Sequence, residues 1–297
     1  MDKKYVFFDL METIVKPPDK AQKINWLKSR GINADSPGYE WLVAGFTQAL
    51  FAVETGVPFA HLRDYYLVND FTSIEDMALA AEQLSTSREK INQNTLLITT
   101  EYTKFVIENT IIYQDVDFVL GQLRKNGYSL CLISNLMSPY KKIVTNLKLK
   151  KWFEGIFYSC EVGYKKPDVR IFQFSMESTK VNSNEVVLVG DNWKSDILGA
   201  LENDINVIFV NRDEKGVPNH LIKNGLKGLL EMKDGKIQIK RDLIPLISPY
   251  FPNKQRDLEE NLIENVYKDS EGFIRLKSLC RVKSISSIRE LYYLLIN

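Results

Sequence analysis

The sequence predicts an α/β fold, a doubly wound parallel sheet covered by helices on both faces. Five short, apolar, β-branched runs recur along the 297-residue chain, and segments with helical spacing of their apolar residues separate most of them. Continuously apolar runs are typical of strands that are buried on both faces of a parallel sheet. Their alternation with helices from about 112 to 211 is the order that a doubly wound fold requires.

We expect a strand at each apolar run. The runs are KYVFFD (4–9), SLCLIS (129–134), IFYS (156–159), EVVLVG (185–190) and NVIFV (206–210). Helices are predicted in the same part of the chain at 117–127, 138–153, 170–180 and 195–204, with one last helix near 221–232.

Residues 16–111 interrupt this pattern, because they contain no strong strand signal. Their apolar spacing predicts helices over AQKINWLKSRG (21–31), GYEWLVAGFTQALFAVETG (38–56), FAHLRDYYLV (59–68) and SIEDMALAAEQLS (73–85). Such an insert can lie over the carboxyl ends of the strands, where open α/β sheets bind ligands. Substrate selection would then fall to polar side chains of the insert, with Gln48, Arg63, Tyr65 and Tyr66 as candidates.

The α/β pattern fades after residue 211, and EMKDGKIQ (231–238) is interpreted as a turn-rich joint. We expect 233–297 to form a small, mostly helical accessory module with at most one short hairpin. Its segment DSEGFIRLKSLCRVKSISSIRELYYLL weakly resembles a La-type or other winged-helix module, which implies nucleic-acid binding through Arg275, Lys277, Arg281 and Lys283. The alternative is a helical face that packs on the core or forms a dimer, which is compatible with the spacing of Leu276, Leu279, Val282 and Ile285.

Composition narrows the class of protein. The hydrophobic content of 44% and charged content of 26% are ordinary for a globular protein, and a net charge of +1 implies no generally basic or acidic partner. No apolar run approaches the roughly 18 to 20 residues that span a bilayer, so we expect no membrane partner. Cys131, Cys160 and Cys280 are odd in number and widely spaced. They predict reduced, buried thiols and a cytoplasmic location.

Polar side chains gather where the predicted strands end. They are Asp9, Ser134, Asn135, Asp191 and Asp196, and the segment GYKKPDVRIF adds Lys165 and Lys166 before a helix. The carboxyl ends of parallel strands meet at one edge of the sheet, so these side chains should converge. Clustered carboxylates repel one another and need a cation, and a small set of hard oxygen ligands suits Mg²⁺. A lysine and a hydroxyl beside that cation suit phosphoryl oxygens, and an Asp there can act as a nucleophile and form an aspartyl-phosphate.

Each of these residues alone has an ordinary explanation. A strand-end Asp is most often a turn or cap residue, and Asp196 could be no more than the N-cap of the helix that follows it. Ser134 and Asn135 could form an ordinary turn. It is their joint order along the chain that favours a functional site.

Four motifs in this order resemble the haloacid dehalogenase superfamily of phosphohydrolases. The motifs are FFDLMET (7–13), LISN (132–135), GYKKPDVRIF (163–172) and VLVGDNWKSDILGA (187–200). The resemblance covers about 1–12 and 112–232. It implies a Rossmann-like core at 1–15 and 112–232, an inserted helical cap at 16–111, and 233–297 as an addition to the superfamily core.

The resemblance also implies a role for each residue. Asp9 would be the nucleophile, and Ser134 and Lys166 would take part in catalysis by holding the phosphoryl group, with Asn135 beside them. A Mg²⁺ cofactor would be bound by Asp9, the backbone carbonyl of Met11, Asp191 and Asp196, the last of which would bind the metal or orient its other ligands.

The sequence departs from the superfamily at Met11. Phosphatases of the superfamily carry an Asp at this position, which protonates the leaving oxygen and then activates the hydrolytic water. Methionine cannot transfer a proton, and general acid–base catalysis is typically worth roughly 10²–10⁴-fold. The loss of this acid–base group decides whether the site hydrolyses its substrate at a useful rate.

Three interpretations stay open. The first is a Mg²⁺-dependent phosphohydrolase that acts on a small phosphorylated metabolite, slowly, with help from Glu12, or on a leaving group of low pKa. The second is a catalytically impaired phosphate- or nucleic-acid-binding or regulatory protein. The third is a hydrolase of the dehalogenase or phosphonatase type, which attacks carbon or cleaves a carbon–phosphorus bond; these members of the superfamily also lack the second Asp. A phosphonatase would need a Schiff-base lysine in the cap, for which Lys20, Lys23 and Lys28 are present.

Overall fold

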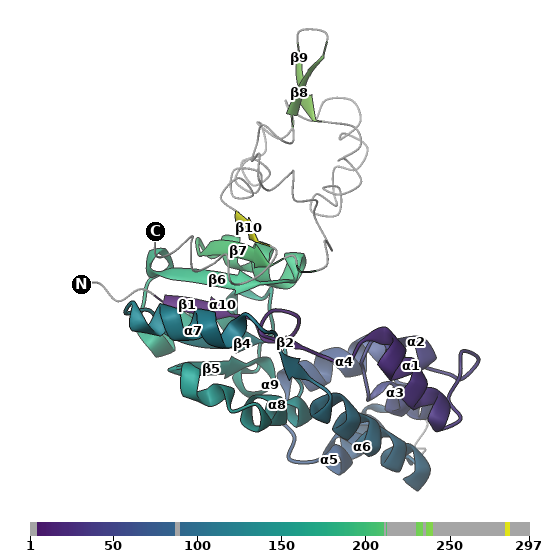
Figure 1. Ribbon diagram of the computed structural model, residues 1–297. Coiled ribbons are helices and arrows are strands. Elements are labelled where there is room, and N and C mark those ends of the chain that lie inside the picture. The colour runs from purple at the N-terminus through teal and green to yellow at the C-terminus, as the bar shows by residue number, and fades with distance from the viewer. Residues whose placement is uncertain are drawn as a thin grey trace.

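A six-stranded parallel sheet forms the centre of the protein (Figure 1). The computed structural model describes residues 5–86, 90–210, 212, 230–233, 236–239 and 283–285. In the order β10-β7-β6-β1-β4-β5, the strands are β10 (Lys283–Ile285), β7 (Asn206–Val210), β6 (Val186–Gly190), β1 (Tyr5–Phe8), β4 (Ser129–Ser134) and β5 (Gly155–Tyr158). Every neighbouring pair in the sheet is parallel, which confirms the predicted fold class.

The side chains of β1 alternate between two hydrophobic clusters, one on each face of the sheet. Val6 and Phe8 belong to the cluster that includes helix α7 (Val116–Lys125). Tyr5 and Phe7 belong to the cluster that includes α10 (Val169–Thr179) and α11 (Gly199–Leu201). A period of two is the geometry of a strand, and helices on both faces explain why the strand sequences are apolar throughout.

The helices of the core differ in detail from those predicted. The single helix expected at 138–153 is three pieces: η1 (Ser138–Tyr140), α8 (Lys141–Asn146) and η2 (Leu149–Trp152). Lys148 breaks it by adopting the left-handed conformation, with φ of 54°. A short helix α9 (Ser159–Val162) follows β5, and a π-helical turn η4 (Trp193–Leu198) precedes α11.

Within the described residues, six helices lie between the short strands β2 (Val15–Lys16) and β3 (Ile111–Ile112), which pair antiparallel. They are α1 (Lys20–Ser29), α2 (Tyr39–Val43), α3 (Ala49–Thr55), α4 (Phe59–Val68), α5 (Ile74–Leu84) and α6 (Gln93–Glu108). They gather beside one end of the sheet in Figure 1 and form the inserted helical cap. The single helix predicted at 38–56 is instead α2 and α3, because Gly45 between them has a φ of +100°.

Side-chain caps explain where three of these helices begin. The Asp19 side chain accepts a hydrogen bond from the Gln22 backbone N–H, and the Gln22 side chain accepts one from the Asp19 backbone N–H, which forms a capping box at α1. Ser73 and Asn92 accept hydrogen bonds from backbone N–H groups at the starts of α5 and α6.

The domain boundaries at 15/16, 111/112 and 232/233 stay predictions.

The C-terminal part of the chain corrects three expectations. Strands β8 (Leu230–Lys233) and β9 (Lys236–Ile239) pair antiparallel, so the helix predicted near 221–232 is wrong for residues 230–232. Residues 231–233 and 236–238 of the segment interpreted as a joint lie in these strands, and in the sequence an Asp-Gly pair between alternating apolar residues is a strong hairpin signal. Ile285 lies in β10 against β7, so its assignment to a helical face is also wrong. The other residues of the predicted accessory module lie outside the described ranges.

Two smaller expectations concern thiols and membranes. Cys131 and Cys160 are buried and in no disulfide, as predicted, and Cys280 lies outside the described residues. No helix in the described ranges has the length and apolarity needed to cross a bilayer.

Candidate active site

Asp9 directly follows β1 at the carboxyl edge of the sheet. Its backbone N–H donates to the carbonyl of Val189 in β6 at 2.9 Å, which keeps the residue in register with the neighbouring strand. Its side chain is only 10% exposed. Burial raises the pKa of Asp9 to about 6, although Lys166 opposes the rise while Asp196 adds to it.

Lys166 lies between the carboxylates of Asp9, which follows β1, and Asp196, which lies in η4 after β6. Its Nζ lies 2.7 Å from Asp9 Oδ1 and 2.6 Å from Asp196 Oδ1, and it donates to the Ile133 carbonyl at 2.8 Å. These three acceptors match the three N–H groups of the ammonium. Burial alone would lower the pKa of Lys166, but the carboxylates of Asp196 and Asp9 outweigh it and raise that pKa. Lys166 is therefore a buried, compensated cation at the centre of the site.

Asn135 fixes the backbone of Lys166. Asn135 Oδ1 accepts the Lys166 N–H at 2.7 Å, and Asn135 Nδ2 donates to the Lys166 carbonyl at 2.8 Å. Ser134 precedes it as the buried last residue of β4. The observed role of Asn135 is to position the lysine, and the contacts of Ser134 and Asn135 with a phosphate stay predictions.

Asp9, Asp191 and Asp196 each place one carboxylate oxygen within 4.8 Å of the others. Burial raises the pKa of Asp191 to about 8, and the carboxylates of Asp9 and Asp196 add to this rise. Such a cluster stores repulsion that a divalent cation relieves, and its hard oxygen donors fit Mg²⁺. The predicted ligand Met11 forms a backbone bridge with Val15 in the same loop, and the ligand role of its carbonyl stays a prediction.

Two glycines allow these loops to approach one another. A Cβ atom on Gly190 would overlap the carboxylate of Asp196, so only glycine lets this acid lie against the end of β6. A Cβ atom on Gly199 would lie 2.8 Å from Pro167 Cβ, so glycine also lets the Lys166–Pro167 segment pack on α11. The backbone N–H of Asn192 then donates to Asp196 Oδ2 at 2.9 Å.

Thr13 and Arg212 contribute to the site, and the sequence analysis assigned neither. The Thr13 hydroxyl donates to Asp191 Oδ1 at 3.2 Å. Arg212 donates to the Thr13 carbonyl at 2.8 Å, pairs with Asp115 at 3.1 Å, and lies over the Tyr113 ring at 3.7 Å. Arg212 thus ties the loop after β1 to the segment after β3. Thr13 carries a weak signal, four residues after Asp9; nothing in the sequence marks Arg212.

A cavity of about 270 Å³ lies between this edge of the sheet and the cap. The core contributes Met11, Glu12 and residues 135–137, and the cap contributes Lys23, the segment 44–46, Leu67 and Val106. The insert therefore lies over the carboxyl ends of the strands, as expected.

None of the four polar candidates in the cap is among the described residues that line this cavity. Tyr66 is buried and donates to the Met77 carbonyl at 2.5 Å, and Arg63 pairs with Asp64 at 2.9 Å. Tyr65 packs against the rings of Tyr66 and Phe71. Gln48 is buried. Sequence alone could not show which faces of these helices point to the sheet.

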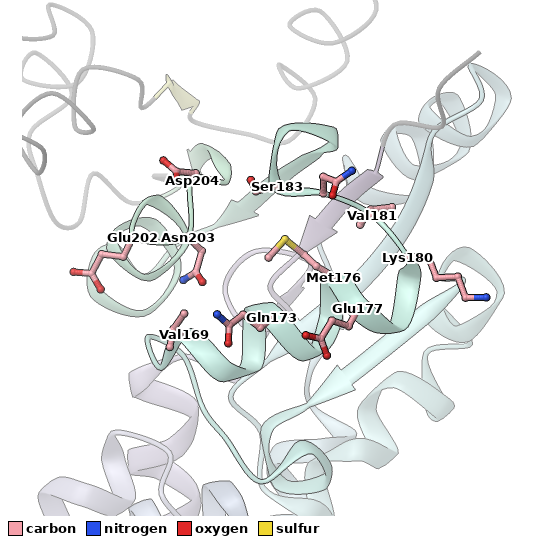
Figure 2. Close-up of a pocket in the computed structure, with 11 residues that line it drawn as sticks. Val169, Gln173, Met176, Glu177, Lys180, Val181, Ser183, Glu202, Asn203 and Asp204 are labelled. Carbon is pink, nitrogen blue, oxygen red and sulfur yellow. The ribbon is translucent and has the colours of Figure 1, made fainter.

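A larger hollow of about 590 Å³ lies elsewhere (Figure 2). Gln173, Glu177 and other residues of α10 line one side of it, and the turn with Glu202 and Asp204 lines another. It contains none of the predicted site residues. We therefore assign the candidate active site to the sheet edge at the smaller cavity, whose lining includes the predicted site residues Met11 and Asn135.

Of the four predicted nucleic-acid-binding residues, Lys283 falls in the described ranges. Lys283 lies in β10, where its backbone pairs with Ile208 of β7. Arg275, Lys277 and Arg281 lie outside the described residues.

Comparison with known proteins agrees with the geometry. Residues 65–210 match the family described as "Haloacid dehalogenase-like hydrolase". This part of the chain belongs to the haloacid dehalogenase-like hydrolases. The predicted resemblance is thereby confirmed. The motif with Asp9 lies before the matched residues, and the sheet joins it to them, because β1 pairs with both β4 and β6.

Curated relatives of this haloacid dehalogenase-like chain carry phosphatase names. Glyceraldehyde 3-phosphate phosphatase of Methanothermobacter thermautotrophicus is 30% identical over 133 residues, which cover 44% of this chain and 58% of the relative. Phosphoserine phosphatase of Thermus thermophilus is 28% identical over 102 residues, or 34% of this chain and 41% of the relative. The chain spans about half the length of these relatives.

The fold is shared with a solved structure, L-2-haloacid dehalogenase from Xanthobacter autotrophicus. The TM-score is 0.51 at 16% sequence identity, and the match covers 99% of each chain. This likeness concerns the fold alone.

Proposed function

We propose that the chain is a Mg²⁺-dependent phosphohydrolase that transfers the phosphoryl group of a small phosphorylated metabolite to Asp9 and then to water. One observation carries this proposal: the buried ammonium of Lys166 contacts both Asp9 and Asp196, within reach of Asp191. A nucleophile, a cation and a set of metal ligands thus meet at the edge where the cap leaves a cavity. The phosphatase names of two relatives support the same class of reaction.

Lys166 orients the nucleophile. Because Asp9 Oδ1 accepts a hydrogen bond from Lys166, the second carboxylate oxygen is the one that attacks phosphorus. The ammonium also offers positive charge to the phosphoryl oxygens, as a buried cation does most effectively. Bound Mg²⁺ would neutralise further phosphoryl charge, held by Asp9, Asp191, Asp196 and the Met11 carbonyl. Thr13 and Asn192 would hold the outer carboxylates in place through their hydrogen bonds.

The test is release of inorganic phosphate from 4-nitrophenyl phosphate, with Mg²⁺ and with a chelator. We expect release only with Mg²⁺ and its loss in Asp9→Asn, which keeps the shape of the side chain but not the nucleophile. Asp35→Asn, in an exposed loop of the cap, is the matched control and should leave the rate unchanged. Equal rates for Asp9→Asn and the wild type would overturn the proposal. Mg²⁺ binding without release from any phosphate would favour the binding-protein interpretation.

A second candidate function is favoured by Lys23. This lysine lines the cavity, whereas Lys20 and Lys28 are exposed. An amine in that position could form a Schiff base with the aldehyde of a phosphonate and so permit cleavage of a carbon–phosphorus bond. Borohydride reduction in the presence of phosphonoacetaldehyde would then attach the substrate carbons covalently to Lys23. Absence of this adduct would rule out the second candidate function and leave the phosphohydrolase as the single proposal.

A further inference from the structure

We propose that the substrate is a phosphate whose leaving group departs without receiving a proton, namely an aryl, enol or acyl phosphate with an apolar body. Phosphate esters of simple alcohols would be poor substrates. This inference rests on the proposed function and specifies its substrate class. It comes from the lining of the 270 Å³ cavity beside Asp9.

The part of the lining closest to Asp9 in the chain is apolar. Met11 lines the cavity two residues after Asp9 and packs against the hydrophobic cluster that contains Phe8 and Leu10. A thioether is a weak acceptor and has no proton to give. A leaving oxygen that is expelled toward this wall therefore receives no proton from Met11.

The three lining residues that carry ionisable groups are engaged or placed elsewhere. The Glu12 carboxylate accepts the Tyr113 hydroxyl at 2.8 Å, so it faces β3 as an acceptor. The Tyr140 hydroxyl is bonded to Thr47 at 2.8 Å, and burial raises the pKa of Tyr140 to about 12. Lys23 belongs to the cap, where its Nζ lies beside Gly45. Among the described residues that line the cavity, none of these three groups occupies position 11, where the superfamily's acid acts on the leaving oxygen, so that oxygen depends on the water that enters with the substrate.

The rest of the lining favours an apolar leaving group. The side chains that supply it are Ala44, Phe46, Leu67, Val106, Leu136 and Met137. Phe46 is backed by Phe59, at 5.3 Å between ring centroids, and Phe59 stacks on Trp41 at 4.4 Å. A polyol in this cavity would lose hydration without gaining partners for its hydroxyls. An aromatic ring or a short acyl chain fits both the surface and the volume.

The chemical steps balance without an acid at position 11. A carboxylate oxygen of Asp9 attacks phosphorus, the bond to the leaving oxygen breaks, and that oxygen departs with the electron pair as a phenolate, enolate or carboxylate. Water then attacks the phosphorus of the aspartyl-phosphate, the bond from phosphorus to Asp9 breaks, and the proton of the water passes to solvent. Because Met11 cannot accept that proton, the second step should limit kcat. The leaving group should then control kcat/KM.

The test is a series of phosphates with leaving groups from 4-nitrophenol through phenol to propanol. kcat/KM is measured with Mg²⁺ for the wild type, Met11→Asp, Met11→Asn and Met11→Leu. We expect the wild-type value to fall by about 10³-fold or more along the series, because leaving groups of higher pKa need more of the missing proton transfer. Met11→Asp should raise the value for propyl phosphate by about 10²-fold or more and change that for nitrophenyl phosphate only slightly. Met11→Asn and Met11→Leu should keep the wild-type slope.

The outcomes separate the inference from the proposed function. A flat wild-type series would overturn the inference alone, because it would show a working proton donor, and a steeper series in Glu12→Gln would identify that donor. Failure to release phosphate from any member would overturn the proposed function and the inference with it. The wild-type slope alone decides the inference if Met11→Asp does not fold.

Discussion

The two sides of the candidate active site are built in opposite ways, although a single residue, Leu10, separates Asp9 from Met11. On one side, Lys166, Asp9 and Asp196 form a buried ionic cluster with hydrogen-bond distances between partners. On the other side, Met11 belongs to a cavity with a mostly apolar lining that the cap completes. A buried ionic cluster is costly unless every charge is compensated. The chain therefore combines a demanding ionic cluster at Asp9 with a cavity side on which Met11 stands where the superfamily's phosphatases carry an acid.

Among the variants that test this difference between the two sides, Lys166→Met should have the largest effect. The change leaves Asp9 and Asp196 as buried carboxylates without their shared cation, which should cost about 3–5 kcal/mol of the free energy of unfolding. Phosphate release should fall by at least about 10²–10³-fold, the usual cost of one lost electrostatic contact in an active site. Urea denaturation and 4-nitrophenyl phosphate turnover measure the two effects.

Lys165→Met is the matched control for this experiment. Lys165 is the preceding residue, is 29% exposed and pairs with Asp64 at 2.6 Å. Its loss should cost no more than about 1 kcal/mol, because partly exposed pairs contribute little. Comparable losses in both variants would contradict the importance assigned to the buried cluster.

Gly190→Ala should have the next largest effect. The added methyl group overlaps the Asp196 carboxylate and forces it away from Lys166, at a cost of about 1–3 kcal/mol in stability. Displacement of the Asp196 carboxylate should also weaken the affinity for Mg²⁺, which calorimetry measures. Gly121→Ala is the control, because its new Cβ would make an ordinary 3.6 Å contact with Trp152. Gly121 lies inside α7, where alanine is a better helix former than glycine by up to about 1 kcal/mol. Unchanged Mg²⁺ affinity in Gly190→Ala would remove Asp196 from the metal site.

Thr13→Val should have the smallest effect. It removes the hydrogen bond to Asp191 without changing the shape of the side chain, so we expect a loss of about 1 kcal/mol in stability and a several-fold weaker affinity for Mg²⁺. Thr99→Val is the isosteric control. The Thr99 hydroxyl is buried without a hydrogen-bond partner among the described residues, so its removal should leave the protein as stable or more so. Greater destabilisation by Thr99→Val than by Thr13→Val would show that the Thr13 hydrogen bond contributes nothing.

The parts of the molecule that sequence could predict are those whose physical cause is local. Strands β1, β4, β6 and β7 were predictable because burial on both faces requires an apolar run, and Asp9 and Asp191 because each follows such a run. Sheet topology then brings the strand ends together, whereas the choice of Lys166 over Lys165 came from the resemblance to the superfamily.

The parts that escaped prediction depend on contacts between distant segments. Arg212 meets Thr13 across 199 residues of chain, and Asn135 meets Lys166 across 31. No spacing rule encodes such pairs. The cap candidates failed for the same reason, because the face of a helix that meets the cavity is set by packing. The β8–β9 hairpin is different: its Asp-Gly signal lies within the segment interpreted as a turn-rich joint, so the turn was predicted and the two strands beside it were not.

The central claim is that Asp9 accepts the phosphoryl group while Met11 slows its release. It is tested most directly by mixing the protein with Mg²⁺ and 4-nitrophenyl phosphate, quenching in acid within the first turnover, and locating the phosphoryl group by mass spectrometry. The account predicts a rapid burst of nitrophenol and a phosphoryl group on the peptide that contains Asp9, with faster decay in Met11→Asp. Turnover that proceeds without a phosphorylated Asp9, or with the phosphoryl group on another residue, would contradict it.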